Sequence, residues 1–152
     1  MTSRMIEVTN STEYEPNCID RLKSINSIYT DRNIELVLCD DKEMRVINYD
    51  TRAVDKTTDV LSFPYDTEGI DFVETEHIPL GSIVISIDKA RDKSDELGHS
   101  MDDELTLLYV HGLLHILGYD HEVDSGEMRA EESKVIAGLN LPKSLIVRTD
   151  IV

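Results

Sequence analysis

The sequence has few cysteines and no long apolar run, and each shortage excludes a class of protein. Cys18 and Cys39 are its two cysteines, too few and too far apart for a disulfide framework or a thiolate zinc site. We therefore expect two buried free thiols. No segment reaches the roughly 18 apolar residues of a membrane span, and residues 1–6 do not lead into an apolar run of signal-peptide length. We expect a soluble, cytoplasmic protein with no membrane partner.

Basic side chains are also scarce, because 15 lysines and arginines stand against 31 aspartates and glutamates. The formal net charge of −16 argues against broad electrostatic attraction to nucleic acid, and DNA is not expected as a partner. Any contact with RNA must then be local, or be made beside a larger partner.

The length of 152 residues predicts one domain over residues 1–152, large enough to bury a core without disulfides or a structural metal. A bound metal would therefore serve chemistry. The final segment, residues 142–152, is ambiguous between a strand and a loosely packed C-terminal extension.

Three of the five histidines lie in the eleven residues 111–121. His111 and His115 are four apart, so on a helix their imidazoles project from one face, one turn apart. Gly118 can end that helix in the left-handed conformation, and the following turn can return His121 to the same ion. The spacing predicts three ligands for one metal ion.

Three neutral imidazoles with a fourth position open to water are typical of a catalytic zinc site. The alternative is that these are hydrogen-bonded core histidines. The spacing matches the metzincin protease signature, but Gly112 stands where those enzymes carry the general-base glutamate, which weakens a protease interpretation. Asp120 is the nearest acid, and it suits either a proton relay or a turn-stabilising role.

Local patterns predict alternating strands and helices along the chain. The expected strands cover residues 5–9, 33–39, a segment ending at Pro64, and 80–87, the last of them central in the sheet. The expected helices cover about residues 17–29, 41–48, 88–97, 100–117 and 125–138, with Asp88 capping the third of them and Ser100 the fourth. Residues 48–59 are expected to form a polar loop. The acidic stretch 66–76 is expected to be a solvated loop, with metal binding as the alternative.

Two details of these helices bear on packing. In the first helix, apolar residues at three-residue steps predict one buried face, made of Ile19, Leu22, Ile25 and Ile28. The helix that begins at Ser100 is apolar on nearly all sides, so it should be buried. The order of elements predicts an α+β fold. We expect a small mixed four-stranded sheet with about five helices packed against it, and the metal site on the buried central helix and the turn after it.

Three motifs together resemble the YbeY family of bacterial zinc-dependent endoribonucleases, which take part in maturation and quality control of ribosomal RNA. The first is His111-Gly112-x-Leu114-His115-x-x-Gly118-Tyr119-Asp120-His121, the second lies within residues 48–64, and the third is the strand at 80–85. The resemblance covers nearly the whole chain in order. Thr57 and Ser82 depart from it, because the family commonly has proline and aspartate there.

The resemblance implies one zinc ion held by His111, His115 and His121, with Arg52 and His115 as catalytic residues. It also implies cleavage of single-stranded RNA, in maturation of the 3′ end of small-subunit ribosomal RNA, and contact with the ribosome or its proteins. Two alternatives stay open. One is a non-catalytic zinc-containing ribosome-assembly factor, and the other is a metal-dependent hydrolase of another substrate.

Overall fold

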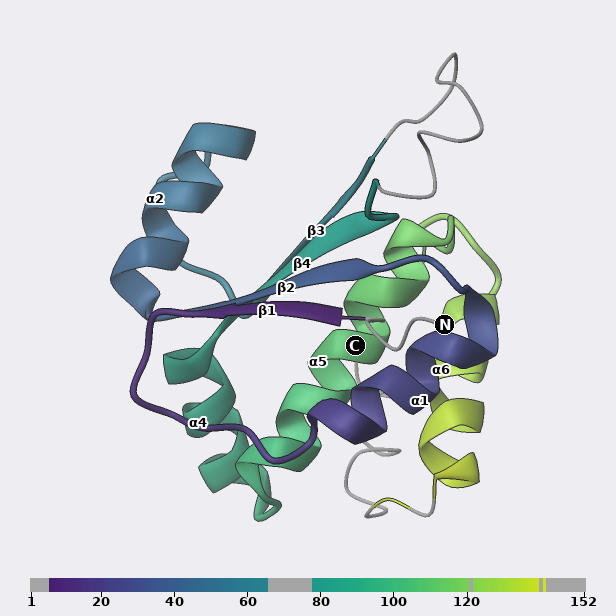
Figure 1. Ribbon diagram of the computed structural model, residues 1–152. Coiled ribbons are helices and arrows are strands. Elements are labelled where there is room, and N and C mark those ends of the chain that lie inside the picture. The colour runs from purple at the N-terminus through teal and green to yellow at the C-terminus, as the bar shows by residue number, and fades with distance from the viewer. Residues whose placement is uncertain (1–5, 66–77, 121, 140, 142–152) are drawn as a thin grey trace.

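Four strands form one mixed sheet in the computed structural model, which describes residues 6–65, 78–120, 122–139 and 141 (Figure 1). The strands are β1 (Ile6–Asn10), β2 (Ile34–Cys39), β3 (Val60–Pro64) and β4 (Gly81–Ser86), in the spatial order β1-β2-β4-β3. Strands β1, β2 and β4 are parallel, and β3 runs antiparallel to β4. This confirms the predicted mixed sheet and the inner position of β4. The acidic stretch 66–76 and the tail 142–152 lie outside the described residues.

Five helices of the described chain complete the predicted α+β architecture, with α2 on one side of the sheet and α1, α5 and α6 on the other (Figure 1). Their bounds are α1 Ile19–Tyr29, α2 Asp41–Arg52, α4 Ile87–Leu97, α5 Met101–Ile116 and α6 Glu127–Gly138. None of the helices in the described ranges is long and apolar enough to cross a membrane.

Strand β4 is buried along its whole length because helices cover both of its faces. Ile83 and Ile85 point into the larger core beneath α5, whereas Val84 packs into the smaller core beneath α2. The two cysteines divide in the same way: Cys18 lies in the larger core and Cys39 in the smaller one, and both are free thiols, as predicted.

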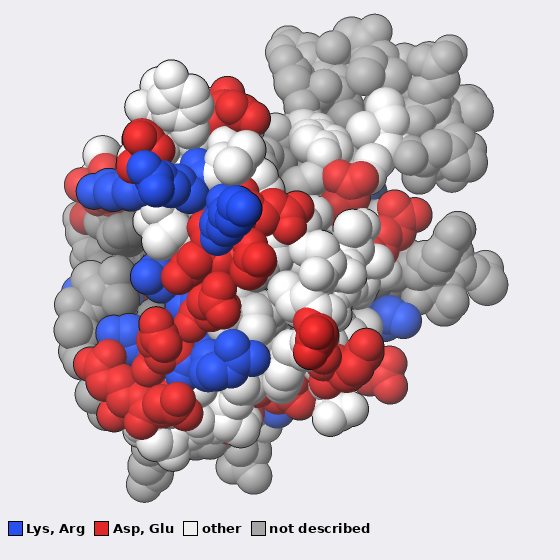
Figure 2. Space-filling view, turned by 90° about the vertical axis from the view of Figure 1, so that its left-hand side faces the viewer, with Lys and Arg blue, Asp and Glu red and all other residues white. Residues whose placement is uncertain are grey.

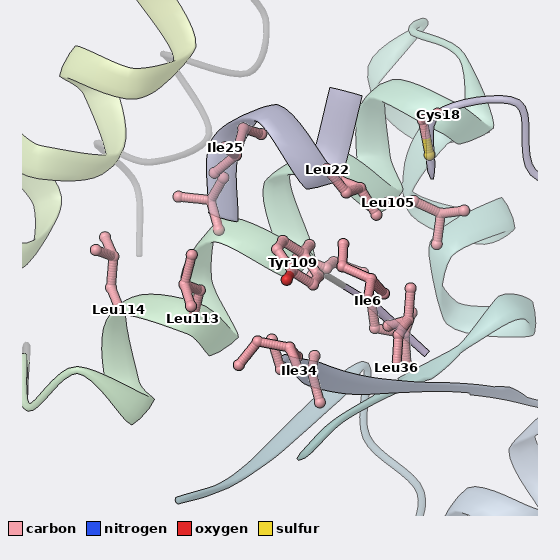
Figure 3. Packing of buried hydrophobic residues seen from close by; sticks show 14 of the residues in the cluster. Ile6, Cys18, Leu22, Ile25, Ile34, Leu36, Leu105, Tyr109, Leu113 and Leu114 are labelled. Carbon is pink, nitrogen blue, oxygen red and sulfur yellow. The ribbon is translucent and has the colours of Figure 1, made fainter. Parts of the chain in front are cut away.

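Helix α5 is the centre of the larger core. Ser100 caps its N-terminus as predicted, with the Asp103 backbone N–H donating to Ser100 Oγ at 3.0 Å. Tyr109 is fully buried and surrounded by aliphatic side chains from α1 and the sheet (Figure 3). Its hydroxyl donates to Asn26 Oδ1 at 2.9 Å, so the phenol is satisfied inside the core.

Helix α2 is longer than predicted, because the polar residues 48–52 continue the helix instead of opening the loop. Asp40 caps it by accepting the Glu43 N–H at 2.8 Å, and the chain leaves the helix at Ala53, whose φ of 60° is left-handed. Polar residues on the outer side of an amphipathic helix resemble a loop when periodicity is weak. Arg52 therefore lies at the end of a helix and not within a flexible loop.

Two other local predictions are wrong. Ile28 is 63% exposed, because each three-residue step rotates the side chain by about 60° away from the previous one, and only Leu22 and Ile25 are buried. Ser86 caps α4, not Asp88, whose carboxylate accepts the Asp41 N–H instead. Helices α1 and α6 each begin two residues later than expected, at residues 19 and 127.

Candidate active site

Helix α5 presents two histidines from an otherwise buried stretch. Between Glu104 and Ile116 every residue is buried except His111 and His115. Their rings lie edge to face with centroids 4.8 Å apart, as expected for side chains one turn apart on a helix. Mounting both imidazoles on the most buried helix limits the movement of the pair.

A buried carboxylate from α6 orients the first of these histidines. Glu132 Oε2 lies 2.7 Å from His111 Nδ1, and Glu132 itself is only 4% exposed. With Nδ1–H donating to the carboxylate, Nε2 carries the lone pair that a metal ion needs. Glu132 was missed in the sequence, although it lies on the same helix face as Met128 and Val135, which are both buried.

The chain reverses direction directly after His115, as the glycine predicted. Gly118 has a φ of 105°, and its N–H donates to the carbonyl of His115 at 3.0 Å. The Tyr119 N–H also turns back, to the carbonyl of Leu114 at 3.0 Å. His121, the predicted third ligand, lies outside the described residues, and within those residues no group of three or more His, Cys, Asp or Glu side chains is placed to hold a metal.

A cavity of about 400 Å³ joins the histidines to the second sequence motif. Its walls come from the end of α2, the segment entering β3, and one side of α5, and its lining residues are Arg52, Thr58, Asp59, Val60, Leu61, Ser62, His111, Gly112, His115 and Glu122. Two stretches about sixty residues apart in sequence thus meet at one cavity. Arg52 is the only cationic residue among those lining side chains.

Arg52 is held by its own helix. Its Nη1 donates to Asn48 Oδ1 one turn earlier, at 3.4 Å, and Asn48 is buried. The other end of the Asn48 amide donates from Nδ2 to the carbonyl of Lys56 at 2.9 Å, which ties down the segment after α2. Asn48 therefore links the position of Arg52 to the loop that leads into β3.

The absence of a side chain at Gly112 has a packing explanation. A Cβ built at this position would lie 3.0 Å from Ile83 Cγ2 and 3.2 Å from Ile83 Cγ1 on β4. Helix α5 approaches the sheet too closely for the glutamate that metzincins carry at this place. The carboxylates of the cavity come instead from Asp59 and Glu122.

Asp120, Ser82 and Thr57, which the sequence also singled out, are not among the residues that line the cavity. Asp120 Oδ1 accepts the Glu122 N–H at 3.0 Å, a contact that stabilises the turn after α5. Ser82 lies on the side of the sheet that α2 covers. Its hydroxyl donates to Glu35 Oε1 at 2.6 Å. That hydrogen bond and one from Tyr65 lower the pKa of Glu35. Thr57 donates to Asp41 Oδ1 at 3.0 Å.

The donor set of the described residues suits zinc. Imidazole nitrogen is a preferred zinc ligand, and zinc-ligating histidines commonly donate their second nitrogen to a carboxylate. His111 already has that arrangement through Glu132, and His115 lies one turn away facing the same cavity. The thiols of Cys18 and Cys39 are not among the cavity residues.

Comparison with known proteins gives one consistent result. A sequence model of the family described as endoribonuclease YbeY matches residues 2–140. The endoribonuclease YbeY of a Nitratiruptor species is 54% identical over 149 residues, covering 98% of this chain and 99% of that protein. The endoribonuclease YbeY of Campylobacter jejuni is 55% identical over 130 residues, covering 86% of this chain and 92% of that protein.

Among solved structures, the solution structure of a Thermotoga maritima protein has a TM-score of 0.60 and covers 93% of this chain and 89% of its own. At 23% sequence identity this likeness shows a shared fold.

Proposed function

Since this chain belongs to the endoribonuclease YbeY family, we propose that it cuts RNA in the cavity between α2, β3 and α5, with one zinc ion held by His111, His115 and His121. Its activity is endonucleolytic hydrolysis of RNA phosphodiester bonds in ribosomal RNA processing. One observation carries the proposed site: the two histidines of α5 share a cavity with the arginine that ends α2. A non-catalytic assembly factor and a hydrolase of another substrate are not favoured, because the relatives are endoribonucleases.

A bound zinc ion supplies Lewis acidity for a phosphoryl oxygen and for a water molecule at the cleavage site. The protein contributes the side chains that would hold the zinc ion in place. Glu132 accepts a hydrogen bond from His111 Nδ1 and would leave Nε2 free to bind a zinc ion, and the buried helix α5 would hold His115 as a second ligand.

Arg52 binds the phosphate of the scissile bond. Its planar guanidinium can donate two parallel hydrogen bonds to phosphoryl oxygens. Asn48 holds that guanidinium at the cavity wall. Charge that develops on the phosphate oxygens during cleavage is therefore met by a cation already in position.

Two carboxylates of the cavity can take part in proton transfer, although Gly112 has no side chain to do so. Asp59 and Glu122 both line it. Asp59 is fixed by the Val60 N–H, which donates to Oδ1 at 2.7 Å. A carboxylate at the cavity wall can accept a proton from a water molecule or from a nucleotide hydroxyl.

The substrate we propose is single-stranded RNA, at the 3′ end of small-subunit ribosomal RNA. The strongly negative net charge disfavours DNA and anionic membranes as partners and favours docking to basic ribosomal proteins. The location that goes with this substrate is the cytoplasm.

The test is cleavage of a labelled single-stranded RNA by zinc-loaded protein, with two variants purified in parallel. Arg52→Ala should keep its zinc and lose cleavage by about 100-fold or more, because the phosphate loses its cation. His121→Ala should lose zinc sharply in a metal assay. Equal cleavage by wild type and Arg52→Ala would trace the activity to a contaminating nuclease, and unchanged zinc in His121→Ala would refute the three-ligand site.

A further inference from the structure

The outer side of α2 carries a cationic and aromatic strip that begins at the cavity. Lys42, Arg45, Tyr49 and Arg52 follow one another at steps of three, four and three residues, so they lie along one side of the helix. All four side chains are exposed, and Tyr49 is 58% exposed. We call these four residues the α2 strip.

Two of the three acidic residues of α2 have partners away from the strip, and the third, Asp50, is exposed next to Tyr49. Asp41 turns toward α4, where its carboxylate pairs with Lys89 at 3.5 Å, and Glu43 accepts a hydrogen bond from Ser11 near β1. Figure 2 shows Lys and Arg side chains on the upper part of this face, at the height of α2, with Asp and Glu side chains beside them. In a protein with a net charge of −16, three of the 15 basic residues thus share one side of one short helix.

The strip is continuous with the cleavage site because Arg52 belongs to both. At a rise of about 1.5 Å per residue, the path from Lys42 to Arg52 is about 15 Å long, the reach of a short stretch of RNA. An RNA strand whose scissile phosphate sits at Arg52 would therefore continue over Tyr49 and Arg45.

Arg45 is preorganised for a second phosphate. Its Nε and Nη2 donate to Asp55 at 2.8 and 3.2 Å. The guanidinium has five N–H donors and this pair uses two, so donors remain for a further ligand. Asp55 holds the Arg45 side chain, and the hydrogen bonds from Arg45, with its charge, lower the pKa of the Asp55 carboxyl.

We propose that the α2 strip is the binding track for an unpaired segment of the RNA substrate, with Tyr49 stacking on a nucleobase and Lys42 and Arg45 contacting flanking phosphates. This inference rests on the proposed function of the adjoining cavity. A surface this acidic cannot hold RNA by general attraction, so local contacts must supply the affinity. Alternation of cations with an exposed aromatic ring is how proteins bind single strands, and a base in a duplex offers no free face to Tyr49.

The test uses zinc-loaded protein and a short single-stranded RNA that carries the fluorescent base 2-aminopurine. Stacking quenches this fluorophore, and initial cleavage rates at several salt concentrations give KM and kcat. Tyr49→Ala should raise KM about 5- to 100-fold, with a smaller effect on kcat, and should remove part of the quenching. Tyr49→Phe should restore both, because it keeps the ring.

The cations have a different signature. Lys42→Ala and Arg45→Ala should each flatten the plot of log KM against log salt by about 0.7, whereas Tyr49→Ala should leave that slope unchanged. Val46→Ala on the same helix is the control for the loss of an exposed side chain, and Lys134→Ala on α6 is the control for the loss of an exposed charge.

Each outcome separates the strip from the cleavage site. Strip variants with the KM, salt slope and quenching of the wild type would overturn the proposal while leaving the endonuclease intact. If the wild type fails to cleave at all, the proposed function fails, and quenching and its salt dependence still decide whether RNA binds the strip.

Discussion

Glu132 shows how much a single buried carboxylate decides at this site. It is a charged side chain that is 4% exposed, and such groups are stable only when paired. Its partner is His111 Nδ1 at 2.7 Å. The pair fixes the ring orientation and tautomer of a proposed metal ligand, and it connects α6 to α5 at the same time.

We predict that Glu132→Gln weakens zinc binding by about 10- to 100-fold, because a neutral amide makes the His111 imidazole a poorer ligand. The zinc dissociation constant can be measured by competition with a chromogenic chelator. Glu131→Gln is the matched control, since that neighbouring carboxylate accepts a hydrogen bond from Tyr29. Equal zinc affinity in Glu132→Gln and wild type would show that the carboxylate only joins the helices.

Residue identity predicted part of the site and left part of it hidden. Two histidines four residues apart on an apolar helix are predicted to share one face, and the structure places His111 and His115 side by side. The roles of these residues and of His121 remain predictions. Apart from its position on an apolar helix face, nothing near Glu132 in the sequence indicates its role. That role depends on the imidazole of His111, twenty-one residues earlier in the chain.

At the scale of elements, the close contact of α5 with β4 determines where the site lies. Gly112 allows the helix to lie closer to Ile83 than a residue with a Cβ would, and His111 and His115 on this helix line the cavity. The same closeness removes room for a catalytic glutamate at position 112. The element that bears the histidines is thus also the one most tightly packed.

We predict that Gly112→Ala lowers the free energy of unfolding by about 1–2 kcal/mol, because overpacking against Ile83 outweighs the gain in helix propensity. Urea unfolding in the presence of a chelator measures this. Gly138→Ala is the control, since a Cβ there meets nothing within 4 Å. A Gly112→Ala protein as stable as the Gly138→Ala protein would contradict this account of the packing.

The elements themselves were largely predictable, with errors that have local causes. Ser100 as a cap, Gly118 as a terminator and β4 as an inner strand are all confirmed. The error at Ile28 came from treating a three-residue repeat as a helical one. The end of α2 was missed because polar residues on the outer side of a helix carry little periodicity, and this concealed the strip that ends at Arg52.

At the scale of the whole molecule, the sheet separates two cores, and each contains one thiol. Burial raises the pKa of Cys18 to about 11 and that of Cys39 to about 12. The thiolate is the reactive form, so both thiols are protected by burial and by protonation.

We predict that at pH 8 neither thiol reacts with an aromatic disulfide reagent until the protein opens, so both react with the slow kinetics of unfolding. Release of the coloured thiolate can be followed by absorbance, with urea-unfolded protein as the fast reference. Cys18→Ala and Cys39→Ala report the remaining thiol separately. Fast reaction of Cys39 alone would show that the smaller core under α2 opens independently.

Read by itself, the sequence determined the α+β class, the location of two histidines on a buried helix, and the family to which the chain belongs. These properties follow from patterns of apolar and polar residues, from residues spaced three to five positions apart, and from the residues that make up each motif. Only the tertiary structure decided that Glu132 contacts His111, that Gly112 is packed against Ile83, and that Arg52 ends a helix at the same cavity. Such contacts join segments distant in the chain, and no local pattern encodes their partners.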